Sequence, residues 1–272
     1  MTIEISGLGD ILQQFDGILI DQFGVLHDGV EPFEDAVPCL KRVAAAGVPV
    51  VAITNSGRMK DPNRQRLDRF GFTPDLIADV VTSGMVARDQ VLKMLKGGSI
   101  SQGDAVLNLT RESDVTVLEG LGLELSDEIS SSTRLVFISG LQPEVLSRQD
   151  YLTMLRPLAE RGVPAICANP DHMVYVNGRA AFGPGLVAAD YEQAGGQVVF
   201  VGKPGAEIFF RSLETLGSLE PSRVLMIGDS HHHDIAGAAA VGCRTLLIAN
   251  GVQAKADNVD VAPDFSIPSL RF

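Results

Sequence analysis

Short apolar runs rich in isoleucine and valine recur along this chain, and amphipathic stretches separate them. The clearest runs lie at 17–20, 48–54, 197–201, 223–227 and 244–249. Strands that are apolar on both faces, with a helix between one strand and the next, are typical of a parallel sheet covered by helices on both sides. We therefore expect an α/β fold with a Rossmann-like parallel-sheet core.

The amphipathic stretches are the expected helices of this core, at 34–46, 61–70, 206–216 and 234–241. Pro32 precedes the first of them and Gly47 follows it. Proline is favoured at a helix start and glycine just past a helix end, so both positions support the prediction.

A second group of strands lies in the middle of the chain, at 105–109, 135–138 and 164–168, with a helical stretch at 143–161. We expect an inserted α/β cap domain at 84–183, which divides the core into 1–83 and 184–272. The expected hinges are Thr82–Gly84 and Phe182–Gly185, because glycine permits unusual φ values and proline fixes φ.

The formal net charge of −12 argues against nucleic acid and acidic membranes as partners, since both would repel the chain. It leaves room for a small anionic substrate, because a local cluster of donors can outweigh the overall charge. Hydrophobic residues make up 45% of the chain and charged residues 21%, which is ordinary for a globular protein with a buried core.

Cysteine usage and the N-terminus predict a cytoplasmic protein. Cys39, Cys167 and Cys243 are isolated from one another, so we expect reduced thiols and neither a disulfide framework nor a zinc site. The first residues lack the basic start and apolar core of a signal peptide. The apolar runs are also far shorter than the roughly 20 residues of a membrane span.

Polar residues gather where the predicted core strands end, at Asp21, Thr54-Asn55, Lys203 and Asp229. The carboxyl ends of strands in an open parallel sheet form its ligand crevice, so four distant segments would meet at one edge. Taken singly, each has an ordinary structural explanation: a turn aspartate, a helix cap, a surface lysine or a common short motif.

Taken together, these residues suit phosphoryl transfer. The Asp21 carboxylate can attack phosphorus and form an aspartyl intermediate. The Thr54 hydroxyl and nearby backbone N–H groups suit a phosphate oxygen, and the Lys203 ammonium can neutralise both reacting groups. Asp229 offers the hard oxygen ligand that Mg²⁺ prefers, and Asp234 can orient Asp229, a metal-bound water or Lys203.

The order of these motifs resembles the four-motif pattern of the haloacid dehalogenase superfamily, over about residues 15–265. The inserted segment ends in Ala168-Asn169-Pro170-Asp171 and then Gly183-Pro184-Gly185. This ending resembles the class IIA capped members, such as the 4-nitrophenyl phosphatase and pyridoxal phosphate phosphatase-like enzymes.

The resemblance implies roles for individual residues. Asp21 would be the nucleophile and a Mg²⁺ ligand, and the backbone carbonyl of Phe23 and the carboxylate of Asp229 would complete the protein's share of the metal shell. Thr54 and Lys203 would hold the phosphoryl group, and Asn55 would shape the loop. Many capped enzymes of this kind associate, so a homo-oligomer is one option for the oligomeric state.

One position departs from the family pattern. Phosphatases of this superfamily carry a second aspartate two residues after the nucleophile, which protonates the leaving group, and here that position is Phe23. General acid catalysis contributes about 10²–10⁴-fold, so simple alkyl phosphates should be poor substrates. Acyl or aryl phosphates need less protonation. Alternatively Asp28, His27 or the histidines at 231–233 supply the proton, although each also has a purely structural explanation.

Two further interpretations remain. Haloacid dehalogenases of the superfamily also carry an aromatic residue at this position, but they need no metal and lack the acidic pair at Asp229 and Asp234. A non-catalytic phosphometabolite-binding protein would keep the site without efficient turnover. We expect a two-domain Mg²⁺-dependent hydrolase of a small phosphorylated molecule, with Asn169 and Asp171 bordering the substrate. Arg58 is a second candidate for meeting an anionic substrate.

Overall fold

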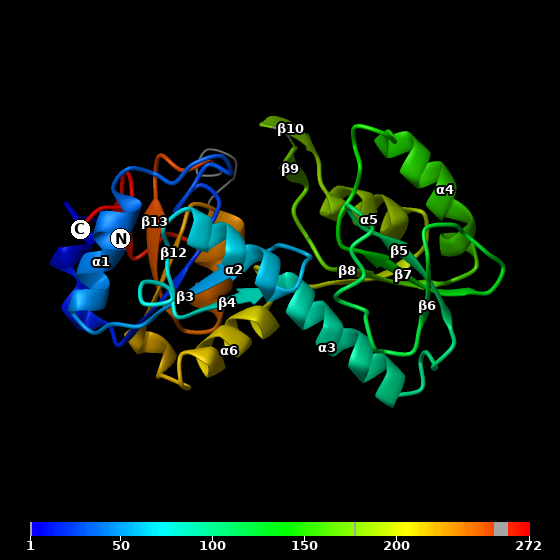
Figure 1. The fold of residues 1–272 in the computed structure, drawn as a ribbon, viewed down its shortest axis with the longest axis horizontal. Helices are drawn as coiled ribbons and strands as arrows, with labels where there is room; N and C mark the ends of the chain where they lie inside the picture. Colours follow the sequence, from blue (N-terminus) through cyan, green and yellow to red (C-terminus); the bar gives the residue numbers. More distant parts are fainter. Residues whose placement is uncertain (1, 177, 253–260) are drawn as a thin grey trace. The chain divides into compact units, whose positions relative to one another are not determined.

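The computed structural model describes residues 2–176, 178–252 and 261–272 (Figure 1). The chain forms two compact units. Unit 1 comprises Met1–Thr54, Asp61–Val81 and Lys203–Phe272, and unit 2 comprises Asn55–Lys60 and Thr82–Gly202. The chain is therefore an α/β protein with a core interrupted by an insertion, as the sequence predicts.

Unit 1 is built on a seven-stranded sheet in the order β1-β14-β13-β12-β2-β3-β4. Every pairing from β1 to β3 along this order is parallel. The strands are β1 (Ile3–Glu4), β2 (Gly17–Ile20), β3 (Val50–Thr54), β4 (Asp79–Thr82), β12 (Val224–Gly228), β13 (Arg244–Ile248) and β14 (Phe265–Ile267). The parallel core sheet is confirmed, and β2, β3, β12 and β13 match the predicted apolar runs.

Helices cover both faces of this sheet (Figure 1). They are α1 (Ala36–Ala45), α2 (Lys60–Arg69), α6 (Ala206–Thr215) and the short α7 (Gly237–Ala240). On one face Leu40 of α1 packs into a core with Ile18 and Ile20. Because side chains alternate along a strand, Leu19 points to the opposite face of the sheet. Helix α6 contacts β3 and buries Ile208 and Phe209. Burial on both faces explains why the strand sequences are apolar almost throughout.

The helix predicted at 234–241 begins differently from the expectation. Residues His231–Ala236 form a short π-helix, in which the Ile235 N–H bonds the Ser230 carbonyl five residues earlier at 3.1 Å. Ser230 caps this turn by accepting from the His233 N–H at 3.1 Å. π-Helical turns are rare and are frequent at functional sites.

Unit 2 is built on a five-stranded sheet in the order β11-β8-β7-β5-β6, with all pairings parallel. Its strands are β5 (Ala105–Leu109), β6 (Glu124–Ser126), β7 (Thr133–Ile138), β8 (Pro164–Cys167) and β11 (Gln197–Phe200). Its helices are α3 (Ser83–Lys96), α4 (Arg148–Glu160) and α5 (Pro184–Gln193), and β9 (Met173–Val176) pairs with β10 (Arg179–Phe182) as an antiparallel hairpin. Leu107, Val136, Leu155 and Tyr191 form part of its own core.

The return from the insertion differs from the expected boundary at 183/184. The apolar run at 197–201 supplies β11, which pairs with β8 at the edge of the unit 2 sheet, with Val198 opposite Ala165. Helix α5 packs into the same core through Val187 and Tyr191. An apolar run specifies a strand but not the sheet that accepts it, so the late strand was assigned to the wrong sheet.

The segment Phe182–Gly185 was expected to be a hinge, but it lies inside unit 2. A Cβ at Gly183 would collide with the backbone of Asp171, and one at Gly185 would collide with Pro170. Both glycines therefore allow the start of α5 to pack closely on the Asn169–Asp171 turn. Their role is close packing of two backbones.

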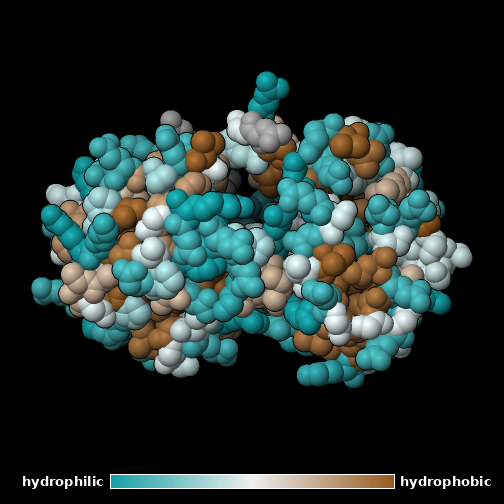
Figure 2. All heavy atoms as spheres, in the orientation of Figure 1, coloured by the Kyte–Doolittle hydropathy of each residue, from teal (hydrophilic) through white to brown (hydrophobic). Residues whose placement is uncertain are grey.

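Hydrophilic side chains cover much of the face shown in Figure 2, and apolar side chains gather in smaller groups, as suits a chain with a net charge of −12. Among the described residues, no helix is both long and apolar enough to cross a membrane.

Candidate active site

Strand pairing in unit 1 brings the first and last acidic motifs together. Ile20 of β2 lies opposite Ile227 of β12, so Asp21 and Gly228-Asp229 leave adjacent strands at the same edge. The Asp21 N–H donates to the Ile227 carbonyl at 2.9 Å, which extends the ladder by one residue. Parallel pairing and equal strand ends thus place these two carboxylates side by side, although 208 positions separate them in the numbering.

Lys203 joins this pair through two short ion pairs. Its Nζ donates to Asp21 Oδ1 at 2.6 Å and to Asp234 Oδ1 at 2.7 Å. The other oxygen of Asp234 accepts from the backbone N–H groups of Asp229 and Ser230, at 3.1 and 3.0 Å. Asp234 therefore bonds both the ammonium of Lys203 and the backbone of Asp229.

The charged side chains of this cluster are almost completely buried, and burial shifts the pKa values of Asp21 and Lys203. Asp21 is 7% exposed, Lys203 3%, and Asp229 and Asp234 are fully buried. Burial raises the pKa of Asp21 to about 8, with Lys203 opposing the rise and the charges of Asp234 and Asp229 adding to it. Burial by itself would lower the pKa of Lys203, but the ion pairs with Asp21 and Asp234 outweigh it and raise that pKa. Lys203 therefore stays an ammonium ion.

The donor set fits a divalent cation. Asp21, Asp229 and Asp234 each offer a carboxylate oxygen within 4.8 Å of the other two. Three carboxylates beside the single ammonium of Lys203 leave formal negative charge in a buried site, which is costly without further positive charge. A hard cation that takes oxygen ligands would offset this charge and favour the ionised form of Asp21.

Phe23 lies in a compact loop that follows β2. Its ring meets the His27 ring edge-on, with 6.2 Å between centroids, and a Cβ at Gly29 would lie 3.3 Å from it. His27 Nδ1 accepts from the Gly29 N–H at 3.0 Å, and the buried imidazole has its pKa lowered to about 4, first by burial and then by the charge of Arg66. His27 is thus a neutral, turn-forming residue and a poor proton donor near neutral pH.

The other candidate acids also have structural roles. Asp28 Oδ1 accepts from the N–H groups of Val30 and Glu31, at 2.8 and 2.9 Å, and these bonds lower the pKa of Asp28. The residue therefore remains ionised and closes the turn. The histidines at 231–233 lie on the π-helix, where the rings of His232 and His233 contact each other with 5.2 Å between centroids.

Thr54 is the last residue of β3, which pairs with β2, so it also lies at the strand-end edge that carries Asp21. The remaining predicted substrate contacts belong to unit 2. Asn55 Nδ2 donates to Asp171 Oδ1 at 2.7 Å, and Asn169 Oδ1 accepts from the Asp171 N–H at 3.0 Å.

Arg58 also belongs to unit 2, and its guanidinium is engaged there. It contacts Glu112 at 2.6 Å and Asp114 at 3.6 Å. The charge of Arg58 is therefore balanced inside its own unit, which the sequence interpretation did not foresee.

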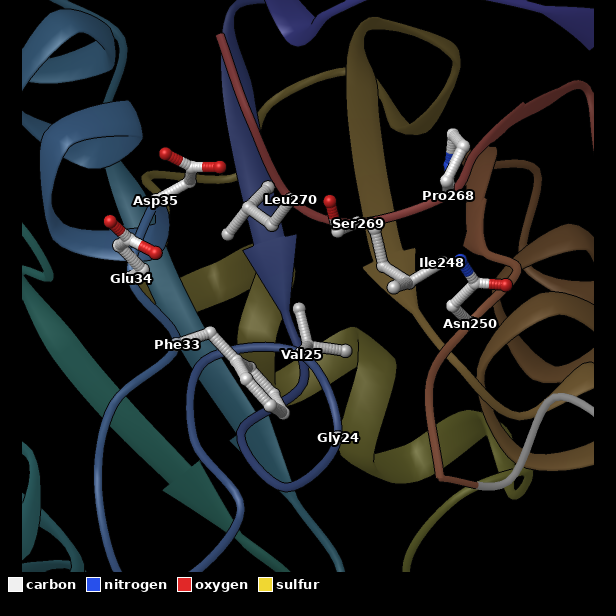
Figure 3. Close-up of a pocket in the computed structure, with 10 residues that line it drawn as sticks. All are labelled: Gly24, Val25, Phe33, Glu34, Asp35, Ile248, Asn250, Pro268, Ser269 and Leu270. Carbon is white, nitrogen blue, oxygen red and sulfur yellow. The ribbon is translucent and has the colours of Figure 1, made fainter.

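Two glycines that the sequence interpretation passed over support the acidic cluster. A Cβ at Gly24 or at Gly251 would overlap the side chain of Asp229, so both loops press their bare backbone against this carboxylate. Gly24 also lines a cavity of about 230 Å³ (Figure 3). Its described lining residues are Gly24, Val25, Phe33, Glu34, Asp35, Ile248, Asn250, Pro268, Ser269 and Leu270. In the sequence both glycines come shortly after a predicted strand, in DQFG (21–24) and ANG (249–251), and this position was the signal that could have identified them.

Together the fold and the cluster define a capped hydrolase with a buried aspartate at the end of the first long core strand. Residues 18–124 match the family model described as haloacid dehalogenase-like hydrolase, and residues 200–271 match a second model, described as HAD-hydrolase-like. The chain is similar to a haloacid dehalogenase-like hydrolase from Brucella suis 1330 of known crystal structure. The TM-score is 0.86 and the identity 31%, over 98% of this chain and 99% of that one.

Two other similar proteins cover most of the chain. Chronophin from Rattus norvegicus is 28% identical over 97% of this chain and 89% of its own. Glycerol phosphate phosphatase Rv1692 from Mycobacterium tuberculosis, crystallised with magnesium, has a TM-score of 0.69 and 26% identity, over 89% of this chain and 71% of that one. The protein belongs to the haloacid dehalogenase superfamily, in which it is a phosphatase-like hydrolase with a class IIA cap.

Proposed function

We propose that this protein is a Mg²⁺-dependent phosphatase that cleaves small phosphorylated metabolites through an aspartyl-phosphate at Asp21, without the usual general acid. The observation that carries the proposal is the buried chain of ion pairs from Asp21 through Lys203 to Asp234, beside Asp229. A carboxylate held against an ammonium at a strand end suits attack on an anionic phosphoryl group.

In the first half-reaction, an Asp21 oxygen attacks phosphorus and the bond from phosphorus to the leaving-group oxygen breaks. The leaving group departs with the electron pair of that bond. In the second half-reaction, water attacks the phosphorus of the acyl phosphate, which releases inorganic phosphate and restores Asp21. Lys203 neutralises charge on the phosphoryl oxygens, and Asp234 keeps the ammonium in place.

We assign Mg²⁺ to Asp21, Asp229 and the backbone carbonyl of Phe23, where the bound ion would supply positive charge to the phosphoryl oxygens. The magnesium in the crystals of the glycerol phosphate phosphatase supports the choice of metal. We further assign Thr54 and Asn55 to the phosphoryl group, and Asn169 and Asp171 to the border of the substrate. The hydrogen bond between Asn55 and Asp171 supports treating these side chains as one polar group.

Phe23 limits the substrate class. Its ring has no proton to give, and His27 and Asp28 are engaged in the turn beside it. The leaving group must therefore depart as an anion or take its proton from water. Acyl and aryl phosphates tolerate this, whereas alkyl phosphates are slowed by a large part of the usual 10²–10⁴-fold contribution of a general acid.

The test is a leaving-group series of aryl, acyl and alkyl phosphates, assayed with Mg²⁺ and with a chelator, and with Asp21→Asn as the inactive control. We expect rates that fall steeply as the leaving-group pKa rises, and no turnover in the variant or with the chelator. Similar rates for aryl and alkyl phosphates would contradict the role given to Phe23.

Because Phe23 cannot donate a proton, it also favours a second candidate function: a phosphometabolite-binding protein without efficient turnover. Binding of phosphate and Mg²⁺, with no phosphate release from any member of the series, would favour it. Halide release from 2-haloacids without metal would instead indicate a dehalogenase, a reaction for which the buried acidic cluster is poorly suited.

A further inference from the structure

The segment that follows Thr54 is part of unit 2, although it continues directly from a strand of unit 1. Residues 55–60 are bonded to that unit at several points. Asn55 donates to Asp171 at 2.7 Å, and the Ser56 carbonyl accepts from the Gly84 N–H at 3.1 Å. A Cβ at Gly57 would collide with the backbone of Ser139, which directly follows β7, so this glycine packs against the carboxyl end of that strand.

Arg58 is held at both its backbone and its side chain. Its carbonyl accepts from the Thr82 hydroxyl at 2.7 Å, and the same hydroxyl caps α3 by accepting from the Met85 N–H. Its guanidinium contacts Glu112 at 2.6 Å and Asp114 at 3.6 Å. Arg58 therefore ties the segment to the start of α3 and to the loop that follows β5.

The loop that receives Arg58 has an unusual backbone. Glu112 and Ser113 both have positive φ, at 57° and 54°, although neither is glycine. Two adjacent non-glycine residues in the left-handed region cost free energy and persist where the surroundings require them. Asp114 is fixed as well, because its Oδ1 accepts from the Thr116 N–H at 2.9 Å and from the Thr116 hydroxyl at 2.6 Å. The loop thus presents two carboxylates to Arg58.

The Arg58–Glu112 ion pair by itself adds little to stability. The side chain of Arg58 is 30% exposed and that of Glu112 is 72% exposed, and exposed pairs contribute little to the free energy of unfolding. The pairs do connect residues 55–60 to the loop that follows β5. Asn55 begins this segment and is joined by one peptide bond to Thr54, so the segment fixes one end of the proposed phosphate-binding dipeptide.

We propose that Arg58 is a positioning residue, which fixes the Thr54-Asn55 junction for phosphoryl binding through its ion pairs with Glu112 and Asp114. This inference rests on the proposed function, because it assigns Thr54 and Asn55 to the phosphoryl group. It differs from the sequence-based expectation that Arg58 itself meets an anionic substrate.

The two roles predict opposite effects when the carboxylates are removed. If Arg58 acts through Glu112, then Glu112→Gln weakens phosphate binding in the same direction as Arg58→Ala. If Arg58 binds the anion directly, Glu112→Gln releases the guanidinium and tightens binding. The Arg111–Glu144 pair is a matched control, since it also has a 2.6 Å contact within unit 2 but does not involve residues 55–60.

The first measurement is turnover of 4-nitrophenyl phosphate, with inorganic phosphate as the competitive inhibitor. We expect Arg58→Ala to raise KM and the inhibition constant of phosphate about tenfold, which is less than the roughly 10²-fold cost of a 1 Å misplacement because the other contacts of residues 55–60 remain. Glu112→Gln should raise both constants in the same direction, with no further effect when it is combined with Arg58→Ala. Arg58→Lys should restore part of the loss, and Glu144→Gln should leave both constants unchanged.

The second measurement is amide hydrogen exchange in the free protein, which needs no activity. Arg58→Ala and Glu112→Gln should speed exchange at residues 55–60 and at Gly84, and Glu144→Gln should not. Faster exchange together with an absence of phosphatase activity would refute the proposed function while leaving the anchoring role intact. Unchanged exchange in Arg58→Ala, or tighter phosphate inhibition in Glu112→Gln, would overturn the positioning role.

Discussion

The buried imidazole of His27 makes the stability of the protein depend on pH in a predictable way. His27 is 1% exposed, its Nδ1 accepts from the Gly29 N–H at 3.0 Å, and its ring lies 4.9 Å from that of Phe70. Burial, followed by the charge of Arg66, lowers its pKa from 6.5 to about 4, which Asp28 only partly opposes. The folded state therefore resists protonation of this residue.

The direction of the effect follows from the two pKa values. Between pH 6.5 and about 4 the unfolded state binds a proton on His27 that the folded state does not bind, so stability falls as the pH falls. A gap of roughly 2.5 between the pKa values corresponds to about 3 kcal/mol when fully expressed, and to about 2 kcal/mol at pH 5. The loss is almost absent at pH 7.

The assay is urea unfolding at pH 7 and pH 5, in the presence of a chelator, for the wild type and for His27→Gln. The variant cannot take up this proton, so its free energy of unfolding should fall by about 2 kcal/mol less between the two pH values. The titration of carboxylates changes the free energy of unfolding equally in both proteins, so it cancels in the comparison. Equal pH dependence in the two proteins, or an NMR titration of His27 near 6.5, would refute the reasoning.

Three further outcomes are expected. Phe23→Asp should raise turnover of alkyl phosphates, by at most about 10²–10⁴-fold, and steady-state rates that do not rise would show that proton donation is not the bottleneck. Lys203→Met should cost about 3–5 kcal/mol in chemical unfolding with a chelator present, because buried carboxylates lose their partner; a loss below about 1 kcal/mol would contradict the ion-pair geometry. Gly251→Ala, whose Cβ overlaps Asp229, should weaken Mg²⁺ binding about 10–100-fold in a calorimetric titration, and unchanged affinity would exclude Asp229 as a ligand.

The sequence alone determined the architecture of the core and the chemistry gathered at its edge. Apolar runs on both sides of each helix specify buried parallel strands, and parallel strands end on a common edge. The positions of Asp21 and Asp229 directly after such strands, and of Asp234 at the following helix start, were therefore enough to predict that these three meet. Lys203 joins them although the strand before it, β11, belongs to the unit 2 sheet. The structure brings all four into one buried cluster.

Tertiary structure decided which sheet each strand joins and which partner each charge finds. The run at 197–201 has the same apolar character as the core strands, but its backbone pairs with β8 in unit 2. The charge of Arg58 is evident in the sequence, whereas its contact with Glu112 depends on a left-handed turn 54 positions later. Strand propensity and side-chain chemistry are local properties, whereas sheet order, burial and ion pairing arise from packing between distant segments. For that reason the sequence predicted the edge at which these side chains meet, but not the ion pairs that link residues 55–60 to the loop after β5.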